Sequence, residues 1–152
     1  MNIKGYIQEN KERFLDELFV LLRQPSVSAK DQGVKEFAAL LEENLKSLGI
    51  KTRIIQTPGQ PMVFGEILGP PGAPTILVYG HYDVQPPEPL EDWMSPPFEP
   101  TIREGKIFAR GASDNKGQFF AYIKAVEKKK KIHGHVPLNI KFLFEGEEEI
   151  GS

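Results

Sequence analysis

The sequence contains no cysteine among its 152 residues. Disulfide bonds and thiolate metal ligands are therefore excluded, and a reducing, cytoplasmic compartment is the simplest expectation. No apolar run approaches the roughly 20 residues of a membrane-spanning helix, and none follows the N-terminus as it would in a secretory signal. The formal net charge is only -2, which gives no electrostatic reason to expect a nucleic-acid or membrane partner.

Two motifs of common hydrolases are also missing. The sequence has neither a Gly-x-Ser-x-Gly nucleophile turn nor a Gly-x-x-x-x-Gly-Lys-Ser/Thr phosphate loop, so acyl-serine chemistry and nucleotide hydrolysis have no support. What is present is ordinary for a globular protein, with 39% apolar and 26% charged residues. A chain of this length can form one domain with its own hydrophobic core.

The spacing of apolar residues predicts an α/β fold. Helical periodicity covers three segments, which are 6–23, 31–48 and 115–131. Strand patterns cover four more, 51–56, 62–68, 75–79 and 138–144, and a short hairpin is expected around Gly105. Strands separated by helices predict a three-layer sandwich around a mixed, mostly parallel sheet. The run 75–79 is apolar throughout, which predicts a strand buried on both faces.

Candidate metal ligands follow two of these strands. His81 and Asp83 come directly after the strand at 75–79, and a cluster of four glutamates begins where the last strand ends. Two unit charges about 4 Å apart repel by roughly 4 kcal/mol at an effective dielectric constant near 20, so clustered carboxylates at a strand end predict a bound cation. Sites in α/β sheets form at the carboxyl ends of strands. The pattern therefore predicts a metal-dependent hydrolase, with a binuclear zinc site as the leading interpretation.

Each candidate also has a plainer interpretation. Asp83 faces the same side as His81 in extended chain and could orient its ring, but the two could equally form a polar pair in a surface turn. Asp114 precedes the third helix, where an aspartate is a good N-cap as well as a possible ligand. Glu148 and Glu149 point in different directions, so one could bind a metal while the other faces an activated water, or both could lie in a solvated turn. His133 and His135 have ligand-like spacing but fall in a predicted turn.

Four motifs in this order resemble the co-catalytic zinc metallopeptidases of the carnosinase, dipeptidase, carboxypeptidase and aminoacylase family. The motifs are residues 80–86, Trp93 with 96–98, residues 105–117 and residues 145–152. The last motif, Glu-Gly-x-Glu-Glu-x-Gly-Ser, looks most like the dipeptidase branch. The resemblance spans nearly the whole chain and implies metal-dependent hydrolysis of an amide bond in a dipeptide or small peptide.

The resemblance also implies a role for each candidate. His81, Asp114 and Glu149 are similar to metal ligands, with Asp114 bridging two divalent ions and followed by a cis peptide bond. Zinc is the expected metal, with manganese and cobalt as alternatives. Asp83 resembles the aspartate that orients the histidine, and Glu148 resembles the general base. The pair Glu148–Glu149 is preferred over Glu147–Glu148 because Ile-Gly-Ser follows Glu149 directly.

Later parts of the family pattern have no counterpart in the sequence. A second acidic ligand, a C-terminal histidine ligand and a lid and dimerisation domain are expected from the family and are missing. Residues 1–152 are therefore expected to be the N-terminal part of a catalytic domain, inactive alone, whose longer form is a homodimer. Two alternatives stay open: a deacylase of N-acyl amino acids, and a non-catalytic fragment or binding module that self-associates through an exposed sheet edge.

Overall fold

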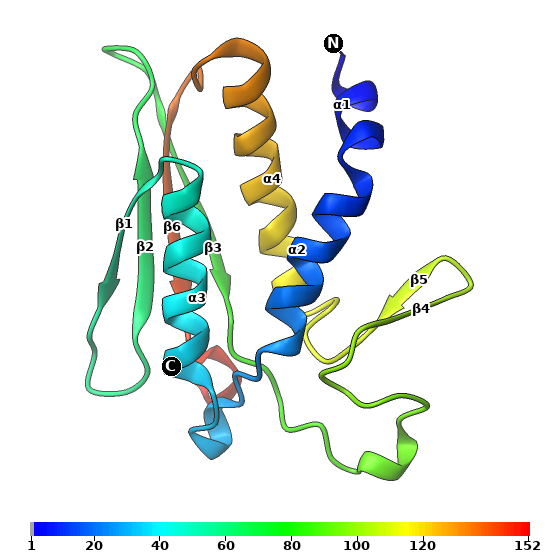
Figure 1. Cartoon of the computed structure of the whole chain (residues 1–152). Helices are drawn as coiled ribbons and strands as arrows, with labels where there is room; N and C mark the ends of the chain where they lie inside the picture. The colour runs from blue at the N-terminus through cyan, green and yellow to red at the C-terminus, as the bar shows by residue number, and fades with distance from the viewer. Residues whose placement is uncertain (1) are drawn as a thin grey trace.

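The computed structural model describes residues 2–152 (Figure 1). Its α-helices are α1 (Ile3–Glu9), α2 (Lys11–Arg23), α3 (Val34–Ser47) and α4 (Lys116–His133). Its strands are β1 (Lys51–Ile55), β2 (Met62–Ile67), β3 (Thr75–His81), β4 (Thr101–Arg103), β5 (Lys106–Phe108) and β6 (Asn139–Glu145). Three short 3-10 turns complete the chain: η1 (Ser28–Lys30), η2 (Leu90–Asp92) and η3 (Glu148–Ile150). None of the described helices combines the length and apolar character that crossing a bilayer requires.

The main sheet has the strand order β1-β2-β6-β3. Strand β2 pairs antiparallel with both β1 and β6, and only β3 and β6 run parallel. The α/β class and the mixed sheet are confirmed, but the expectation of a mostly parallel sheet is wrong for these strands. The reason is the length of the connections. A short turn joins β1 to β2 and imposes a hairpin, whereas α4 lies between β3 and β6 and permits a parallel crossover. The separate β4–β5 hairpin around Gly105 is confirmed.

The hydrophobic core lies between this sheet and one layer of helices. Phe142 and Phe144 of β6 are fully buried, and the ring of Phe144 lies 4.7 Å from that of Phe119 in α4. Fully buried residues of α3, including Phe37 and Leu41, belong to the same core cluster. The intervening residue of β6, Leu143, faces the other side and is only half-buried.

Helices α3 and α4 pack on one face of the sheet, α2 packs against these two helices, and α1 packs against α2 on the same side (Figure 1). Within residues 2–152 the fold therefore has two layers, and the expected third layer is not among them. The prediction that the strand at 75–79 is buried on both faces is also wrong, since Leu77 is 61% and Tyr79 54% exposed. An unbroken apolar run indicates that a strand can be covered on both faces. It does not say whether the covering residues lie in the same 152 residues.

The predicted helices needed smaller corrections. The first divides at Asn10, whose side chain and backbone N–H both donate to the Tyr6 carbonyl and end α1. The third runs to His133 and ends at Gly134, which has the left-handed φ of 75° that glycine adopts without strain. His133 and His135 are exposed at this end of α4, which lies about 27 Å along an 18-residue helix from its start. The length of α4 thus separates both histidines from Asp114, and of the two only His135 lies in the predicted turn, because His133 is the last residue of α4.

A buried ion cluster joins the first two helices to α4. Glu127 accepts hydrogen bonds from Arg13 (2.5 Å), Lys124 (2.7 Å) and Tyr6 (3.1 Å). Burial by itself would raise the pKa of Glu127, but the bonds from Arg13 and Lys124 lower it below its usual value. The carboxylate therefore stabilises the fold above the unfolded pKa near 4.3, and this contribution disappears as the pH falls through the lower folded value.

Replacing Glu127 by glutamine should lower the free energy of unfolding by roughly 2 kcal/mol at pH 7, because Arg13 and Lys124 would keep only the more exposed Glu17 as a shared counter-charge. The deficit should shrink in acid as the wild-type carboxylate becomes protonated. Urea titrations at several pH values measure it. Glu42→Gln is the control, because Glu42 makes only a surface pair with Lys46 and should matter little. A deficit at pH 7 that persists unchanged in acid would contradict the assignment.

Candidate metal centre

Three segments that are distant in the sequence converge at one end of the sheet. Strands β3 and β6 are parallel neighbours, with His81 opposite Glu145, so their carboxyl ends lie at the same end of the sheet. Asp83 follows the first strand, and η3, which carries Glu148 and Glu149, follows the second. The start of α4 joins them, since the Asn115 side chain accepts a hydrogen bond from the His81 N–H (3.3 Å). The peptide bond between Asp114 and Asn115 is cis, as the family resemblance implies.

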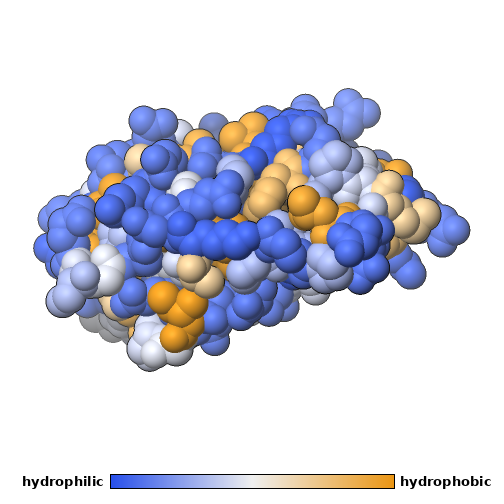
Figure 2. All heavy atoms as spheres, turned by 90° about the horizontal axis from the view of Figure 1, so that it is seen from below, coloured by the Kyte–Doolittle hydropathy of each residue, from blue (hydrophilic) through white to orange (hydrophobic). Residues whose placement is uncertain are grey.

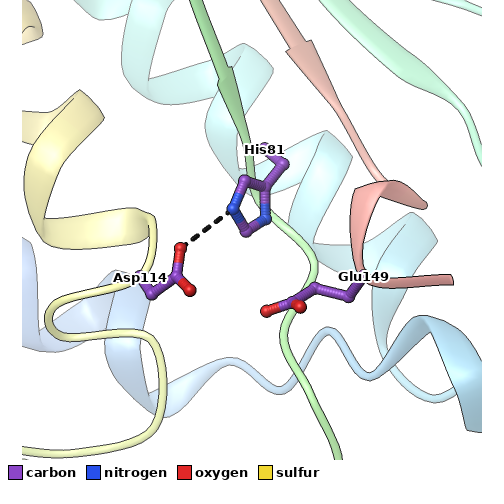
Figure 3. Close-up of side chains that lie close together, drawn as sticks. All are labelled: His81, Asp114 and Glu149. Atoms are coloured by element: carbon purple, nitrogen blue, oxygen red, sulfur yellow. Dashed lines mark hydrogen bonds and ion pairs between the residues drawn. The ribbon is translucent and has the colours of Figure 1, made fainter. Parts of the chain in front are cut away.

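His81, Asp114 and Glu149 form a compact group of metal-type ligands (Figure 3). One ligand atom from each lies within 4.8 Å of the other two, and His81 Nε2 is 3.1 Å from Asp114 Oδ1. The His81 side chain is only 9% exposed, whereas that of Asp114 is 73% exposed. The group is thus anchored in the protein on the histidine side and open to solvent on the aspartate side. The surrounding end of the molecule is mainly hydrophilic, with hydrophobic side chains in small separate groups (Figure 2).

This donor set suits a divalent transition metal. One imidazole nitrogen and two carboxylate oxygens are typical zinc ligands, at about 2.0–2.2 Å from the ion. Ligand atoms at such distances stand roughly 3.4 Å apart in a tetrahedron, close to the observed separation between His81 and Asp114. The residues present therefore fit a metal ion.

Asp83 is fully buried beside this group and is positioned to orient His81. Its Oδ1 lies 3.4 Å from His81 Nδ1, and its backbone carbonyl lies 3.1 Å from the same nitrogen. Burial would raise the pKa of Asp83, but hydrogen bonds from His81, Ser28 and the Glu149 N–H lower it. The carboxylate therefore stays ionised in the interior. Nδ1 of His81 is held by Asp83, which leaves Nε2 directed at Asp114 for a metal.

The negative charge also acts on the histidine. Burial by itself would lower the pKa of His81. Its hydrogen bonds with the Asp83 side chain and carbonyl, together with the charges of Asp83 and Glu148, outweigh burial and raise the pKa to about 9. Without a metal the ring therefore carries a proton at neutral pH, and the carboxylates around it attract positive charge. A divalent cation would take the place of that proton.

The three consecutive glutamates have different surroundings. Glu148 is half-exposed, with Oε2 3.7 Å from His81 Nε2. The Glu149 carboxylate accepts a hydrogen bond from Gln85 (2.9 Å). Glu147 points away from the group and accepts a hydrogen bond from the Gln60 N–H in the turn between β1 and β2 (2.9 Å). Of these three glutamates, Glu148 and Glu149 lie near His81.

Sequence reasoning missed three residues that support the site. Gln85 holds Glu149, and Ser28 donates to Asp83 (2.6 Å). Lys116 is fully buried and donates to the Gln24 carbonyl at the end of α2 (2.7 Å), which ties down the segment that carries Asp114. Burial lowers the pKa of Lys116 to about 7, although the Asp83 charge acts in the opposite direction. Gln85 and Lys116 could have been noticed inside the motifs at 80–86 and 105–117, but Ser28 lies outside all four.

The chain is similar to a protein family and to several known enzymes. A family model described as peptidase family M20/M25/M40 matches residues 77–152. The chain is 33% identical to the Beta-Ala-His dipeptidase of Mus musculus over 97% of its own length and 33% of that enzyme. It is 34% identical to the Cys-Gly metallodipeptidase dug1 of Schizosaccharomyces pombe, over 96% of its own length and 34% of that enzyme. The chain thus spans about one third of the length of these relatives.

A solved structure of an M20 family enzyme has a similar fold. An M20 family metallo-carboxypeptidase from Sulfolobus solfataricus is 41% identical and matches with a TM-score of 0.86, over 91% of this chain and 32% of that one. The match to the family model covers half of the 152 residues and includes all five candidate site residues from His81 to Glu149. The dipeptidase names among the relatives agree with the expected branch. The chain therefore belongs to peptidase family M20/M25/M40.

Proposed function

We propose that the native protein containing residues 1–152 hydrolyses an amide bond in a dipeptide or small peptide, with divalent metal ions as cofactors. The observation that carries the proposal is the convergence of His81, Asp114 and Glu149 beside the half-exposed Glu148. The relatives' names, Beta-Ala-His dipeptidase and Cys-Gly metallodipeptidase, support a dipeptide as substrate. Zinc is the proposed metal, with manganese and cobalt as alternatives for the same ligands.

The proposed site would hold two ions, with Asp114 as a ligand of both. Asp114 is suited to contact both because its side chain is 73% exposed and a carboxylate oxygen lies within 4.8 Å of ligand atoms of both His81 and Glu149. His81 would complete one side of the pair and Glu149 the other. Metal ions bound here would supply a water molecule of lowered pKa and would polarise the scissile carbonyl. Asp83 would keep the His81 ring in the required tautomer through the contact at Nδ1.

Glu148 is the proposed general base. Its carboxylate is 46% exposed and lies 3.7 Å from His81 Nε2, so it can reach a water molecule next to the ligand group. It would accept a proton from that water as the water attacks the carbonyl carbon. It would then donate the proton to the departing amine nitrogen. Glu149 is instead proposed as a metal ligand, and its carboxylate is held in place by the hydrogen bond from Gln85.

Residues 1–152 are further proposed to be the N-terminal part of a longer catalytic domain and to be inactive alone. The chain spans only about one third of the length of these relatives, which supports this proposal. One face of the sheet is covered by no described helix, which also supports it, because further parts of a longer domain could pack there. Homodimerisation of the native protein, self-association of the fragment through an exposed sheet edge and a cytoplasmic location stay predictions. Light scattering of the fragment and of the native protein measures the first two, and cell fractionation the third.

The test compares substrate classes on the native protein after metal loading. Release of amino acids is followed from a set of dipeptides and from the corresponding N-acetyl amino acids. A higher kcat/KM for dipeptides is expected. Faster release from the acetylated compounds would instead assign a deacylase, and a metal-loaded, folded protein that cleaves neither would refute the hydrolase proposal. The same assay on the 152-residue chain should show no turnover, and turnover there would refute the fragment proposal.

A further inference from the structure

We propose that Ser28 is a positioning residue of the metal centre: it fixes the Asp83 carboxylate and thereby the placement of both His81 and the Glu148–Glu149 segment. This inference deepens the proposed function and rests on it for the metal. No sequence motif pointed to Ser28, because it lies between α2 and α3 and precedes Asp83 by 55 residues. The inference comes from the contacts around the buried carboxylate.

The Asp83 carboxylate connects three separate segments. Its Oδ1 contacts His81 Nδ1 (3.4 Å) and accepts from the Glu148 N–H (3.2 Å). Its Oδ2 accepts from the Ser28 hydroxyl (2.6 Å) and from the Glu149 N–H (3.1 Å). The orientation of this carboxyl group therefore helps to set where the histidine ring and the two glutamates lie relative to one another, together with the Asp83 carbonyl that also contacts His81 Nδ1. A residue that holds this carboxyl group in place therefore helps to position His81 and the Glu148–Glu149 segment.

Among these four contacts, the one from Ser28 is the shortest. Its length of 2.6 Å is typical of a charge-assisted O–H···O⁻ hydrogen bond. Both partners are buried, with Ser28 5% and Asp83 0% exposed, so water cannot readily replace the hydroxyl. Loss of this bond would leave Oδ2 with the single, longer bond from Glu149. The carboxyl group could then rotate away from its present plane.

The segment that carries Ser28 is itself held against the strand end. The Ser26 hydroxyl donates to the Tyr82 carbonyl (2.6 Å), and the Val84 N–H donates to the Ser26 carbonyl (2.9 Å). These bonds attach the segment to the residues on both sides of Asp83. The hydroxyl of Ser28 is thus delivered to Oδ2 by a fixed backbone.

A second connection links the same region to η3. Asp31, which directly follows η1, accepts a hydrogen bond from the Gln60 side chain (2.8 Å). The backbone N–H of Gln60 in turn donates to Glu147 (2.9 Å), the residue before η3. The loop between α2 and α3 is therefore joined to the glutamate segment both through Asp83 and through Gln60. It is a structural part of the centre and more than a connection between helices.

Two serines of this loop provide a matched pair of variants. Ser26 and Ser28 are both buried and both donate a 2.6 Å hydrogen bond, but only Ser28 bonds to Asp83. Changes to partners outside the ligand shell typically weaken metal binding by roughly 10–100-fold. For Ser28→Ala we expect a loss of zinc affinity near the lower end, about tenfold. For Ser26→Ala we expect less than about threefold, because the backbone bond from the Val84 N–H to the residue 26 carbonyl remains and still holds the segment. Ser28→Thr keeps a hydroxyl and should recover most of the affinity.

The experiment uses the native protein and measures zinc affinity by competition with a chromophoric chelator, alongside the thermal midpoint of the metal-free form. Selective loss of affinity in Ser28→Ala, at a midpoint similar to that of Ser26→Ala, supports the proposal. Equal affinity losses in both alanine variants would overturn it, because they would indicate general loosening of the loop. Unchanged affinity in Ser28→Ala would overturn it as well.

A second readout separates this inference from the proposed function. In the metal-free protein, NMR should show that Ser28→Ala moves the amide signals of Glu148 and Glu149 and the ring signals of His81, while Ser26→Ala leaves them in place. If the wild type binds no zinc but these signals move, the positioning role stands and the metal proposal fails. If the signals do not move, the positioning role of Ser28 fails whatever the metal content.

Discussion

Replacing Glu148 by glutamine should reduce kcat of the native protein by roughly 10² to 10⁴-fold, the usual contribution of a general acid–base group. Glutamine keeps the size and polarity of the side chain but cannot accept a proton from water. The Glu148 carboxylate lies 3.7 Å from His81 Nε2 and is half-exposed, so no structural contact should be lost with it. Steady-state kinetics on a dipeptide, with metal content determined for the same samples, measures the effect.

The neighbouring Glu147 provides the control. Its carboxylate bonds to the backbone of Gln60 in the turn between β1 and β2, away from the ligand group. Glu147→Gln should therefore leave kcat within a few-fold of wild type, even though it changes the same charge one residue away. If Glu148→Gln retained its activity, or if the two variants lost equal activity at full metal content, Glu148 would not be the base.

Truncating Phe144 to alanine should lower the free energy of unfolding of the 152-residue chain by about 3–5 kcal/mol, the usual cost of removing a buried phenylalanine ring. Phe144 is fully buried, and its ring lies 4.7 Å from that of Phe119 and 5.7 Å from that of Phe142. The alanine would leave a cavity between the sheet and α4. Urea titrations of the two proteins measure the difference at constant m-value.

The adjacent residue on the same strand tests the two-layer arrangement. Leu143 points to the opposite face of β6, which no described helix covers, and is only half-buried. Leu143→Ala should therefore cost about 1 kcal/mol or less, below the range for buried leucines. A cost near that of Phe144→Ala would mean that the outer face is also packed in the isolated chain. That result would contradict the two-layer description.

The positions of helices and strands could be read from the sequence because apolar periodicity reports local geometry. The strand at 138–144 and the hairpin around Gly105 were predicted within a residue or two. Which strands run parallel could not be predicted, because apolar periodicity does not indicate which strands are neighbours in the sheet. The exposure of Leu77 was likewise hidden, because an apolar residue looks the same in sequence whether its cover lies inside or outside the chain.

The three candidate ligands could be predicted from the sequence for a different reason. His81, Asp114 and Glu149 stand at strand and helix ends, where parallel strands and the helix between them bring their side chains together. Ser28 could not be found in this way, because it lies outside all four motifs and its partner Asp83 is 55 residues away. A serine in a loop carries no pattern that indicates a distant buried carboxylate. Only the folded arrangement reveals such supporting contacts.

The metal content of the native protein tests the central claim most directly. Elemental analysis after gel filtration, on wild type and on Asp114→Ala, counts the divalent ions bound per chain. Two ions are predicted for wild type. The variant should retain one at most, because Asp114 is proposed to contact both and its exposed side chain makes its only described side-chain hydrogen bond to His81. A folded wild-type protein without metal, or an Asp114→Ala variant with the full wild-type content, would contradict the account.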